Sequence, residues 1–394
     1  MNIVFLLTGF LLVFGIGYAV SHHRRGIRYK PIIAMLITQL VLAFLLLNTG
    51  IGIDLILFIS KAFDTLMKLG ISGVDFVFGG LENAGKSTFF LDVLLPIIFI
   101  SVLIGILNYF KILPFLIRWT GLVLSKLNGM GKLENYIAVS SAFLGQSEVF
   151  LTAKKQLGLV SGRRLYTLCT SAMSAVSIAI VGAYMTMLDP RYVVVAIVVN
   201  ILSALIVANI INPYKLTEEE DLIEPQEEEK RPAFFQMISE SIMDGLKVAV
   251  IVAAMLIGFI ALMNLINEIF LLIFRISFQD VLGYIFAPVA FLMGVPQPEI
   301  VSAGSVMATK IVTNEFVAML NFKDMASSLS PKTVGIVSVF LVSFANFGSI
   351  GIITGSVKAL HERQGDLVAK FGLKLLLGST LASVLSATIV GVFL

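Results

Sequence analysis

Long apolar stretches are the feature that most constrains this chain. A helix needs about 20 apolar residues to cross the hydrocarbon core of a bilayer. Such stretches are expected at residues 3–20, 31–48, 89–110, 166–187, 192–212, 247–270, 333–356 and 371–394. Hydrophobic residues make up 58% of the 394 residues and charged residues 13%, too few charges to cover a soluble protein of this size. The sequence therefore predicts an all-α polytopic membrane protein with eight transmembrane helices, and excludes a soluble enzyme, a nucleic-acid-binding protein and a disordered chain.

Basic residues predict how the chain is oriented. Arg24, Arg25, Arg28 and Lys30 follow the first apolar stretch, and the positive-inside rule places such a loop in the cytoplasm. Counting the spans forward places both termini outside and the acidic loop at 213–246 inside. We expect a multi-pass protein of the cell membrane.

Residues 51–78 predict an amphipathic helix rather than a simple span. Asp54, Lys61, Lys68 and Asp75 recur every seven residues among Ile, Leu, Phe and Val. A helix of this kind lies in the membrane interface. It can equally pack against a neighbouring bundle or subunit, with its polar stripe facing water.

Two further segments, 119–152 and 283–322, are moderately apolar but interrupted by Gly, Ser, Asn and Pro, and both hold acids. Backbone that breaks inside a membrane must be buried in protein or line a cavity. We interpret them as two opposed re-entrant hairpins, the first entering from the inside and the second from the outside. The alternative is a pair of ordinary short helices in extended loops.

A weak internal repeat supports the hairpins. The segments 171–180 and 343–352 share two Ser and two Ile at equal spacing, and each follows a hairpin that carries an acid. An inverted repeat with broken helices places the binding site where its halves meet near the midplane. The expected organisation is scaffold helices at 1–50, an interfacial helix and loop at 51–88, a scaffold span at 89–118, a first transport repeat at 119–212, a cytoplasmic acidic loop at 213–246, a scaffold span at 247–282 and a second transport repeat at 283–394.

Glu148 and Glu315 are the acids most indicative of function. A carboxylate at membrane depth costs a few kcal/mol and is a functional hypothesis by default. The alternative is a structural ion pair, for which Lys310 is a candidate partner of Glu315. Amides and hydroxyls in the same segments suit a polar, mostly neutral, hydroxylated ligand; they are Gln146, Ser147, Asn314, Asn346 and Ser349.

Other chemistry is excluded by spacing and context. Gly80–Ser87 fits the phosphate-loop pattern, but that pattern needs a buried strand before it and a helix after it, and this loop is expected outside the cell. Cys169 is the single cysteine and only three histidines are present. No metal site, cofactor or catalytic triad is expected, and the chain is predicted not to be an enzyme.

Three motifs resemble the signature of concentrative nucleoside transporters, in particular the bacterial NupC-type branch. They are Gly145-Gln-Ser-Glu148, Thr309–Ala318 and Ser343–Ile350. The resemblance covers essentially the whole chain. It implies a homotrimer in the lipid bilayer that moves nucleosides by alternating access and binds no nucleic acid.

The resemblance also implies roles for individual residues. Those matching the nucleobase-binding positions are Gln146, Ser147, Glu148 and Ile180. Those matching the ribose-binding positions are Glu315, Asn346, Ser349 and Phe344. The implied substrates are nucleosides with a pyrimidine preference, such as uridine and cytidine, with adenosine as a further candidate.

The cation positions depart from the sodium-coupled pattern. Sodium-coupled members use an Asn four residues before the first Gly and a Ser in the broken helix, where this chain has Ser141 and Ala175. The carbonyls of Leu144 and Val176 remain as ligands. We therefore predict proton symport with Glu148 or Glu315 as the proton carrier, and keep sodium symport as the alternative. The rivals from other classes are a membrane-embedded enzyme and an ion channel.

Overall fold

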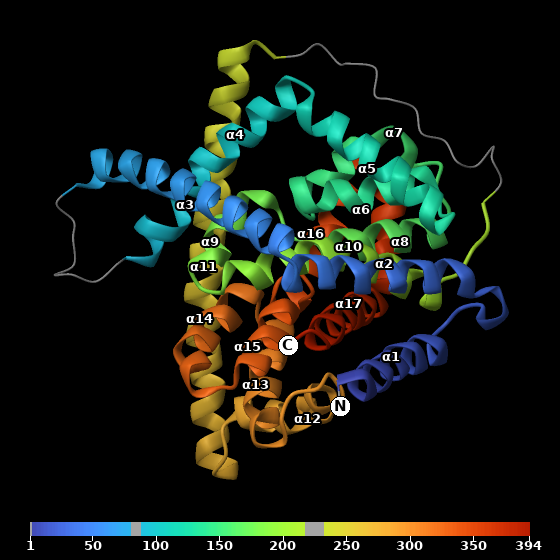
Figure 1. The fold of residues 1–394 in the computed structure, drawn as a ribbon. Helices are drawn as coiled ribbons and strands as arrows, with labels where there is room; N and C mark the ends of the chain where they lie inside the picture. Colours follow the sequence, from blue (N-terminus) through green and yellow to red (C-terminus); the bar gives the residue numbers. More distant parts are fainter. Residues whose placement is uncertain (1, 80–87, 217–231) are drawn as a thin grey trace.

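The computed structural model describes residues 2–79, 88–216 and 232–394, and they form helices with no strand among them (Figure 1). The all-helical prediction is confirmed. The α-helices are α1 Asn2–Ala19, α2 Tyr29–Asn48, α3 Gly50–Phe78, α4 Ile97–Tyr109, α5 Ile112–Asn128, α6 Lys132–Leu144, α7 Lys154–Leu157, α8 Gly162–Ser174, α9 Ile178–Met185, α10 Pro190–Ile211, α11 Phe234–Phe274, α12 Phe278–Leu292, α13 Ile300–Val312, α14 Glu315–Met325, α15 Pro331–Leu341, α16 Phe347–Leu360 and α17 Glu362–Gly391. A π-helical turn, η2, covers Phe90–Leu94, and short 3₁₀ helices cover η1 Arg24–Gly26, η3 Glu148–Ala153, η5 Gln297–Glu299 and η6 Ala326–Ser328.

Six helical segments of the described chain are long and apolar enough to cross a membrane. They are Tyr29–Asn48, Phe90–Tyr109, Gly162–Met185, Pro190–Ile211, Phe234–Phe274 and Glu362–Gly391. The predicted spans at 3–20 and 333–356 correspond to α1 and to the broken pair α15–α16. The count of eight transmembrane helices stays a prediction.

The helices differ sharply in burial. Most residues of α8, α10 and α17 are buried, and these three helices pack against one another at the centre. The 41-residue α11 is mostly exposed and runs along one edge of the molecule (Figure 1). A long apolar helix with few protein neighbours suits contact with lipid.

The segment predicted to be amphipathic is one 29-residue helix, α3, which extends beyond the other helices (Figure 1). Asp54, Lys61, Lys68 and Asp75 are all exposed, and the Lys68 ammonium donates to Asp64 at 2.6 Å. The polar stripe predicted from the sequence therefore exists. Its position in the membrane interface stays a prediction.

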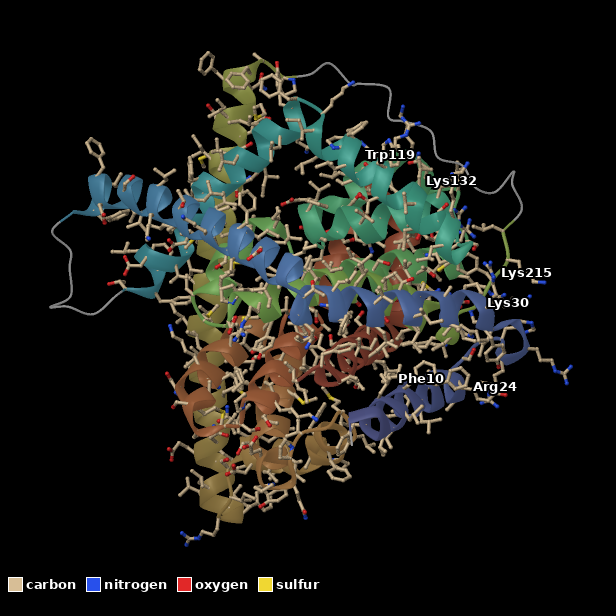
Figure 2. All side chains as sticks on the ribbon, viewed as in Figure 1. Phe10, Arg24, Lys30, Trp119, Lys132 and Lys215 are labelled. Atoms are coloured by element: carbon tan, nitrogen blue, oxygen red, sulfur yellow. The ribbon has the colours of Figure 1, made fainter. Side chains whose placement is uncertain are left out.

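The loops that carry the basic residues gather on one side of the molecule. The Arg28 guanidinium donates to the Gly129 carbonyl at 2.9 Å, and Asn212 donates to the Arg163 carbonyl at 2.8 Å. Figure 2 shows Arg24, Lys30, Lys132 and Lys215 on this same side. The basic loops thus share one side of the molecule, as the positive-inside rule requires. That this side faces the cytoplasm stays a prediction. The acidic run at 217–230 lies outside the described residues.

Two helical pairs occupy the places predicted for hairpins, within narrower bounds. The first pairs α6 with η3 and α7, whereas residues 119–128 belong to α5. The second pairs α13 with α14, whereas residues 283–292 belong to α12. α12 lies so close to α13 that a Cβ on Gly304 would meet the Gly283 carbonyl oxygen at 2.6 Å.

The starts of these two pairs lie near opposite ends of α1. The Lys332 ammonium, close to the start of the second pair, lies 5.4 Å from the centre of the Phe5 ring at the beginning of α1. The start of the first pair lies beyond the end of α1, where Arg28 binds Gly129. An 18-residue helix is about 27 Å long. This separation supports opposed hairpins, and their re-entry into a bilayer stays a prediction.

Candidate functional site

Two broken helices meet at the centre of the candidate site. α8 and α9 are separated by residues 175–177, and α15 and α16 by residues 342–346. The two breaks are joined directly, because the Phe344 N–H donates to the Ala175 carbonyl at 3.2 Å. Backbone groups freed by broken helices need partners when they are buried. The inverted-repeat argument thus predicted correctly that both helices break.

The tip of the first hairpin lies against the first break. Gly145 ends α6 with a φ of +90°, a conformation that L side chains rarely adopt, and a Cβ there would meet the Ser177 side chain at 3.1 Å. The Ser177 hydroxyl donates to the Phe143 carbonyl at 3.5 Å. The residues predicted to form the coupling-ion region are therefore brought to one place and are buried; they are Ser141, Leu144, Ala175 and Val176.

Two of these four residues make a hydrogen bond through an oxygen. The Ser141 hydroxyl donates to the Ile137 carbonyl at 2.6 Å, one helical turn earlier. Ala175 has no side-chain oxygen, and its carbonyl accepts the Phe344 N–H. The Ser141 oxygen keeps its lone pairs, and the buried Ser174 hydroxyl beside the break makes no hydrogen bond with the described residues.

The tip of the second hairpin delivers a buried carboxylate to the same centre. Glu315 is the first residue of α14 and is 5% exposed. One carboxylate oxygen accepts from the Tyr184 hydroxyl at 3.0 Å, and the other accepts from the Asn346 amide at 3.1 Å. Each oxygen keeps further lone pairs for a ligand. The carboxylate is thus fixed by α9 and by the second break at once.

Asn346 and Ser349 are arranged around that carboxylate. Asn346 caps α16, with its amide oxygen accepting the Ser349 N–H at 2.9 Å while its NH₂ group donates to Glu315. The Ser349 hydroxyl is buried and makes no hydrogen bond with the described residues. Phe344 is buried in the same break, two residues before Asn346. The four residues predicted for the ribose side therefore belong to one cluster.

The residues predicted for the nucleobase side are less constrained. Ile180 and Gln146 are buried, and the Gln146 amide oxygen makes no hydrogen bond with the described residues. Ser147 and Glu148 are exposed, and no hydrogen bond or ion pair holds the Glu148 carboxylate among the described residues. They belong to the loop and turn that follow Gly145, and η3 packs against α16.

Tyr184 is a contact that the sequence argument missed. It is fully buried, its ring packs edge-on against Phe316 at 5.1 Å, and its hydroxyl binds Glu315. The only feature of the sequence that could have indicated this contact is the presence of a tyrosine in the apolar half-helix after the first break. The suggested pairing of Lys310 with Glu315 is not found, because the Lys310 ammonium binds the Phe340 carbonyl and the Ser343 hydroxyl instead.

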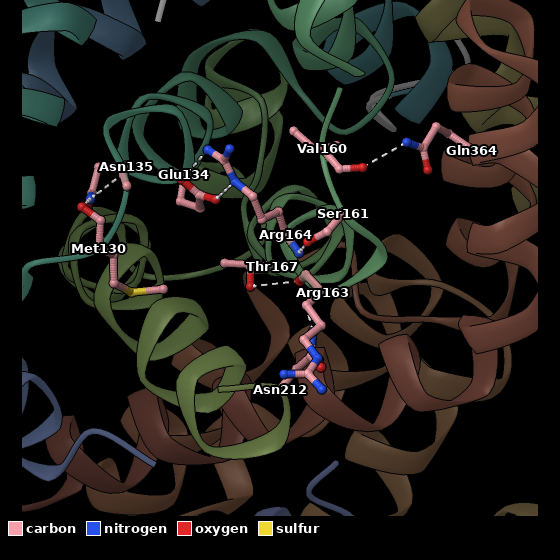
Figure 3. A network of polar contacts seen from close by, with 11 residues as sticks. Met130, Glu134, Asn135, Val160, Ser161, Arg163, Arg164, Thr167, Asn212 and Gln364 are labelled. Carbon is pink, nitrogen blue, oxygen red and sulfur yellow. Dashed lines mark hydrogen bonds and ion pairs between the residues drawn. The ribbon is translucent and has the colours of Figure 1, made fainter. Parts of the chain in front are cut away.

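A buried ion pair fixes the base of the first hairpin. The Arg164 guanidinium on α8 donates to both carboxylate oxygens of Glu134 on α6, at 2.7 and 3.2 Å (Figure 3). Gln364 donates to the Val160 carbonyl at 2.9 Å and so ties α17 to the same region. Sequence reasoning assigned no role to this pair.

The arrangement supports binding rather than covalent chemistry. A fixed carboxylate, amides and hydroxyls meet at two helix breaks, among apolar walls. No group of three or more His, Cys, Asp or Glu side chains in the described chain is placed to hold a metal ion. Broken helices that meet two hairpin tips are typical of helical membrane transporters built from inverted repeats.

The chain belongs to the concentrative nucleoside transporter family. Residues 192–391 match the family described as "Na+ dependent nucleoside transporter C-terminus", and residues 8–81 match its N-terminal counterpart. Residues 90–191 match a domain described as "Nucleoside recognition". The protein is therefore a multi-pass membrane transporter of the nucleoside-transporting class, and not an enzyme.

Curated relatives cover the full chain. The purine nucleoside transport protein NupG of Bacillus subtilis is 36% identical over 98% of this chain and 98% of its own length. The nucleoside permease NupC of Helicobacter pylori is 29% identical over 99% of this chain and 98% of its own. Among solved structures, CNTnw in an inward-facing substrate-bound state superposes with a TM-score of 0.94 at 29% identity, covering 100% of this chain and 98% of that one.

Proposed function

We propose that this transporter imports nucleosides by proton symport with alternating access. The observation that carries the proposal is the Glu315 carboxylate, held by Tyr184 and Asn346 where the second hairpin meets both broken helices. A carboxylate in this position can accept hydrogen bonds from two vicinal ribose hydroxyls. Hydroxyl and amide groups around it suit the rest of a neutral sugar.

We assign the two ends of the nucleoside to the two hairpins. Residues on the ribose side are Glu315, Asn346, Ser349 and Phe344, which form one buried cluster. Residues on the base side are Gln146, Ser147, Glu148 and Ile180. The buried Gln146 oxygen without a protein partner supports this assignment, since an amide can read a donor–acceptor edge of a planar ring.

Proton coupling is supported by the two side chains at the positions where sodium-coupled members have Asn and Ser. Sodium must replace its water ligands with several oxygens when it enters a protein, as other hard cations do. Ala175 offers no side-chain oxygen, and the Ser141 side chain has a shorter reach than asparagine. Protonation of Glu148 or Glu315 would lower the cost of closing the site around a charge.

Sodium symport is the second candidate, and one observation favours it. The family that matches residues 192–391 is described as sodium-dependent. The Leu144 and Val176 carbonyls, the Ser141 oxygen and water would then have to complete the coordination shell.

Base preference also has two candidates. The resemblance to the bacterial NupC-type branch favours pyrimidine nucleosides such as uridine and cytidine, with adenosine as a further substrate. The name of the Bacillus subtilis relative, a purine nucleoside transport protein, favours purines. Competition of uridine uptake by cytidine, adenosine and guanosine ranks the bases directly.

Uptake of labelled uridine into proteoliposomes tests the driving ion. An inward proton gradient in sodium-free medium should drive accumulation, and exchange of choline for sodium at fixed pH should change the initial rate little. A steep sodium dependence without a response to the proton gradient would overturn proton coupling. Counterflow by preloaded uridine separates a transporter from a channel.

We also propose that the chain works as a homotrimer, as the resemblance implies. Exposed apolar residues on α3 and α11, such as Phe76 at 92% and Ile257 at 73% exposure, provide surface for lipid or for neighbouring subunits. Native mass spectrometry of the detergent-solubilised protein should show a mass three times 42.8 kDa. A stable monomer or dimer would exclude the trimer.

A further inference from the structure

Lys310 is a fully buried cation that the nucleoside site does not use. It lies in the last turn of α13, and its side chain is among the largest that are completely buried. No carboxylate of the described chain lies within ion-pair distance of its ammonium. A buried charge is costly unless hydrogen bonds satisfy it, so its partners indicate why it is there.

Three oxygens surround this ammonium. Nζ donates to the Phe340 carbonyl at 2.6 Å, to the Ser343 hydroxyl at 2.6 Å and to the Ser383 hydroxyl at 3.4 Å. An ammonium has three N–H groups and no acceptor, so this cage matches its full donor capacity. The Phe340 ring lies 4.5 Å from Nζ and adds a cation–π contact.

The three oxygens around the Lys310 ammonium lie at the second helix break, residues 342–346. Phe340 lies in the last turn of α15, where carbonyls have no helical partners and the helix dipole favours a positive charge. Ser343 belongs to the break itself, and Ser383 belongs to the central helix α17. Lys310 therefore connects the second hairpin, the second break and the core of the molecule.

The first repeat holds its cation region at the corresponding place. There the first half of the broken helix, α8, ends at Ser174, and Ala175 and Val176 follow as the predicted coupling-ion region. In the second repeat the equivalent helix end is occupied by a covalently attached ammonium. The end of the first half-helix is thus followed by the predicted coupling-ion region in one repeat, and is bound by a lysine ammonium in the other.

We infer that Lys310 is a resident cation, a positioning residue that holds the second break in its binding geometry. Its contact with Ser343 fixes the segment from which Phe344 reaches Ala175 and Asn346 reaches Glu315. This role goes beyond the proposed function and is independent of which ion drives transport.

Chemical rescue tests the inference. Lys310→Ala removes three methylene groups and the ammonium, a fragment that propylammonium reproduces. Uridine uptake by this variant should fall roughly tenfold or more, as expected for loss of a charge-assisted hydrogen bond. Propylammonium should restore uptake several-fold and raise the apparent melting temperature in detergent, while 1-propanol, of similar size and no charge, should do neither.

Controls separate a resident cation from simple packing. Lys323→Ala removes an exposed lysine of the same hairpin and should respond to neither additive. Lys310→Met keeps the volume without the charge and should be as impaired as Lys310→Ala. Wild-type uptake and melting temperature in Lys310→Met, or equal rescue by propanol, would overturn the inference.

If the Lys310 variants do not fold, a variant of one of its hydrogen-bond partners tests the same inference. Ser343→Ala retains Lys310 but removes one acceptor of the cage, and it should lower the melting temperature and uridine affinity together. Unchanged values for both would also overturn the inference. The melting temperature is measured without transport, so a failure of the transport proposal remains distinguishable from a failure of this one.

Discussion

The two hairpins are fixed at their bases in chemically different ways. In the first, Glu134 and Arg164 form an ion pair in which the side chains are 0% and 7% exposed. In the second, Glu299 accepts from the Ser330 N–H at 2.9 Å and from its hydroxyl at 2.8 Å, and both residues are partly exposed. Both acids join the start of a hairpin to the start of a broken helix. Only the first depends on a buried charge.

At the tips of the hairpins the order is reversed, because here the second hairpin, not the first, carries the buried acid. Glu315 at the second tip is buried and fixed by two donors, whereas Glu148 after the first tip is exposed and has no partner among the described residues. The proposed ribose side is therefore preorganised, and the proposed nucleobase side is left open to a ligand. A preorganised group loses less entropy on binding, which makes the second tip the stronger anchor.

The largest expected effect tests how differently the starts of the two hairpins are fixed. Glu134→Gln should destabilise the protein by about 3–5 kcal/mol, because it leaves Arg164 buried without its counter-charge. Glu299→Gln should cost only about 1 kcal/mol, since its partner is neutral and partly hydrated. Unfolding in detergent by denaturant gives both values. Equal losses of unfolding free energy in the two variants would show that the contacts at the starts of the two hairpins contribute equally to stability.

The next effect tests the difference between the tips. Glu315→Gln should nearly abolish uridine uptake while the protein stays folded, because the amide is uncharged and replaces one of the two acceptor oxygens by a donor. The lost charge-assisted bond is worth roughly 1.5–3 kcal/mol, which corresponds to roughly 10- to 150-fold weaker affinity. Binding of labelled uridine to the purified variant measures this loss.

Two comparisons sharpen that measurement. Asp324→Asn changes an exposed acid on the same helix and should bind uridine normally. On the wild type, 2′,3′-dideoxyuridine should compete poorly, since it lacks the diol. Competition equal to that of uridine would show that Glu315 does not read the ribose.

A smaller effect is expected from the residue that orients Glu315. Tyr184→Phe removes the hydroxyl that donates to one carboxylate oxygen but keeps the packing against Phe316. Asn346 still holds the other oxygen, so we expect a loss of about 1 kcal/mol, roughly fivefold in uridine affinity. Tyr284→Phe, at an exposed tyrosine, is the matched control. No change in Tyr184→Phe would mean that Asn346 alone positions the carboxylate.

Apolar stretches predicted the helical class, and the internal repeat predicted the two broken helices. The resemblance to the transporter family predicted the residues that cluster around Glu315. The contacts that complete the cluster were not predictable, because they join distant segments. Tyr184 and Glu315 are 131 residues apart, and Lys310 finds an acceptor 73 residues away in Ser383. Local patterns identify which residues require partners, whereas packing decides which partners they obtain.

The hairpin bounds were too wide for a related reason. Pro288 was interpreted as an interruption, but it lies inside α12, which continues from Phe278 to Leu292. Gly121 likewise lies inside α5 and is buried against the backbone of Tyr136. Small residues and proline in a membrane helix mark close packing as readily as they mark breaks.

The smallest expected effect concerns a segment that belongs to neither repeat. The phosphate-loop pattern at Gly80–Ser87 lies outside the described residues, between α3 and η2. On either side of it the chain is helical rather than a strand feeding a loop, so the backbone cradle for phosphate lacks its usual support. Lys86→Ala and Ser87→Ala should each leave the initial rate of uridine uptake within about 0.5 kcal/mol of wild type, as for substitutions away from a structural or functional feature. ATP on either side of the proteoliposome should have no effect. Uptake that depends on ATP and is lost in Lys86→Ala would place an energising site outside both repeats, and the contrast between the two hairpins would then not account for transport.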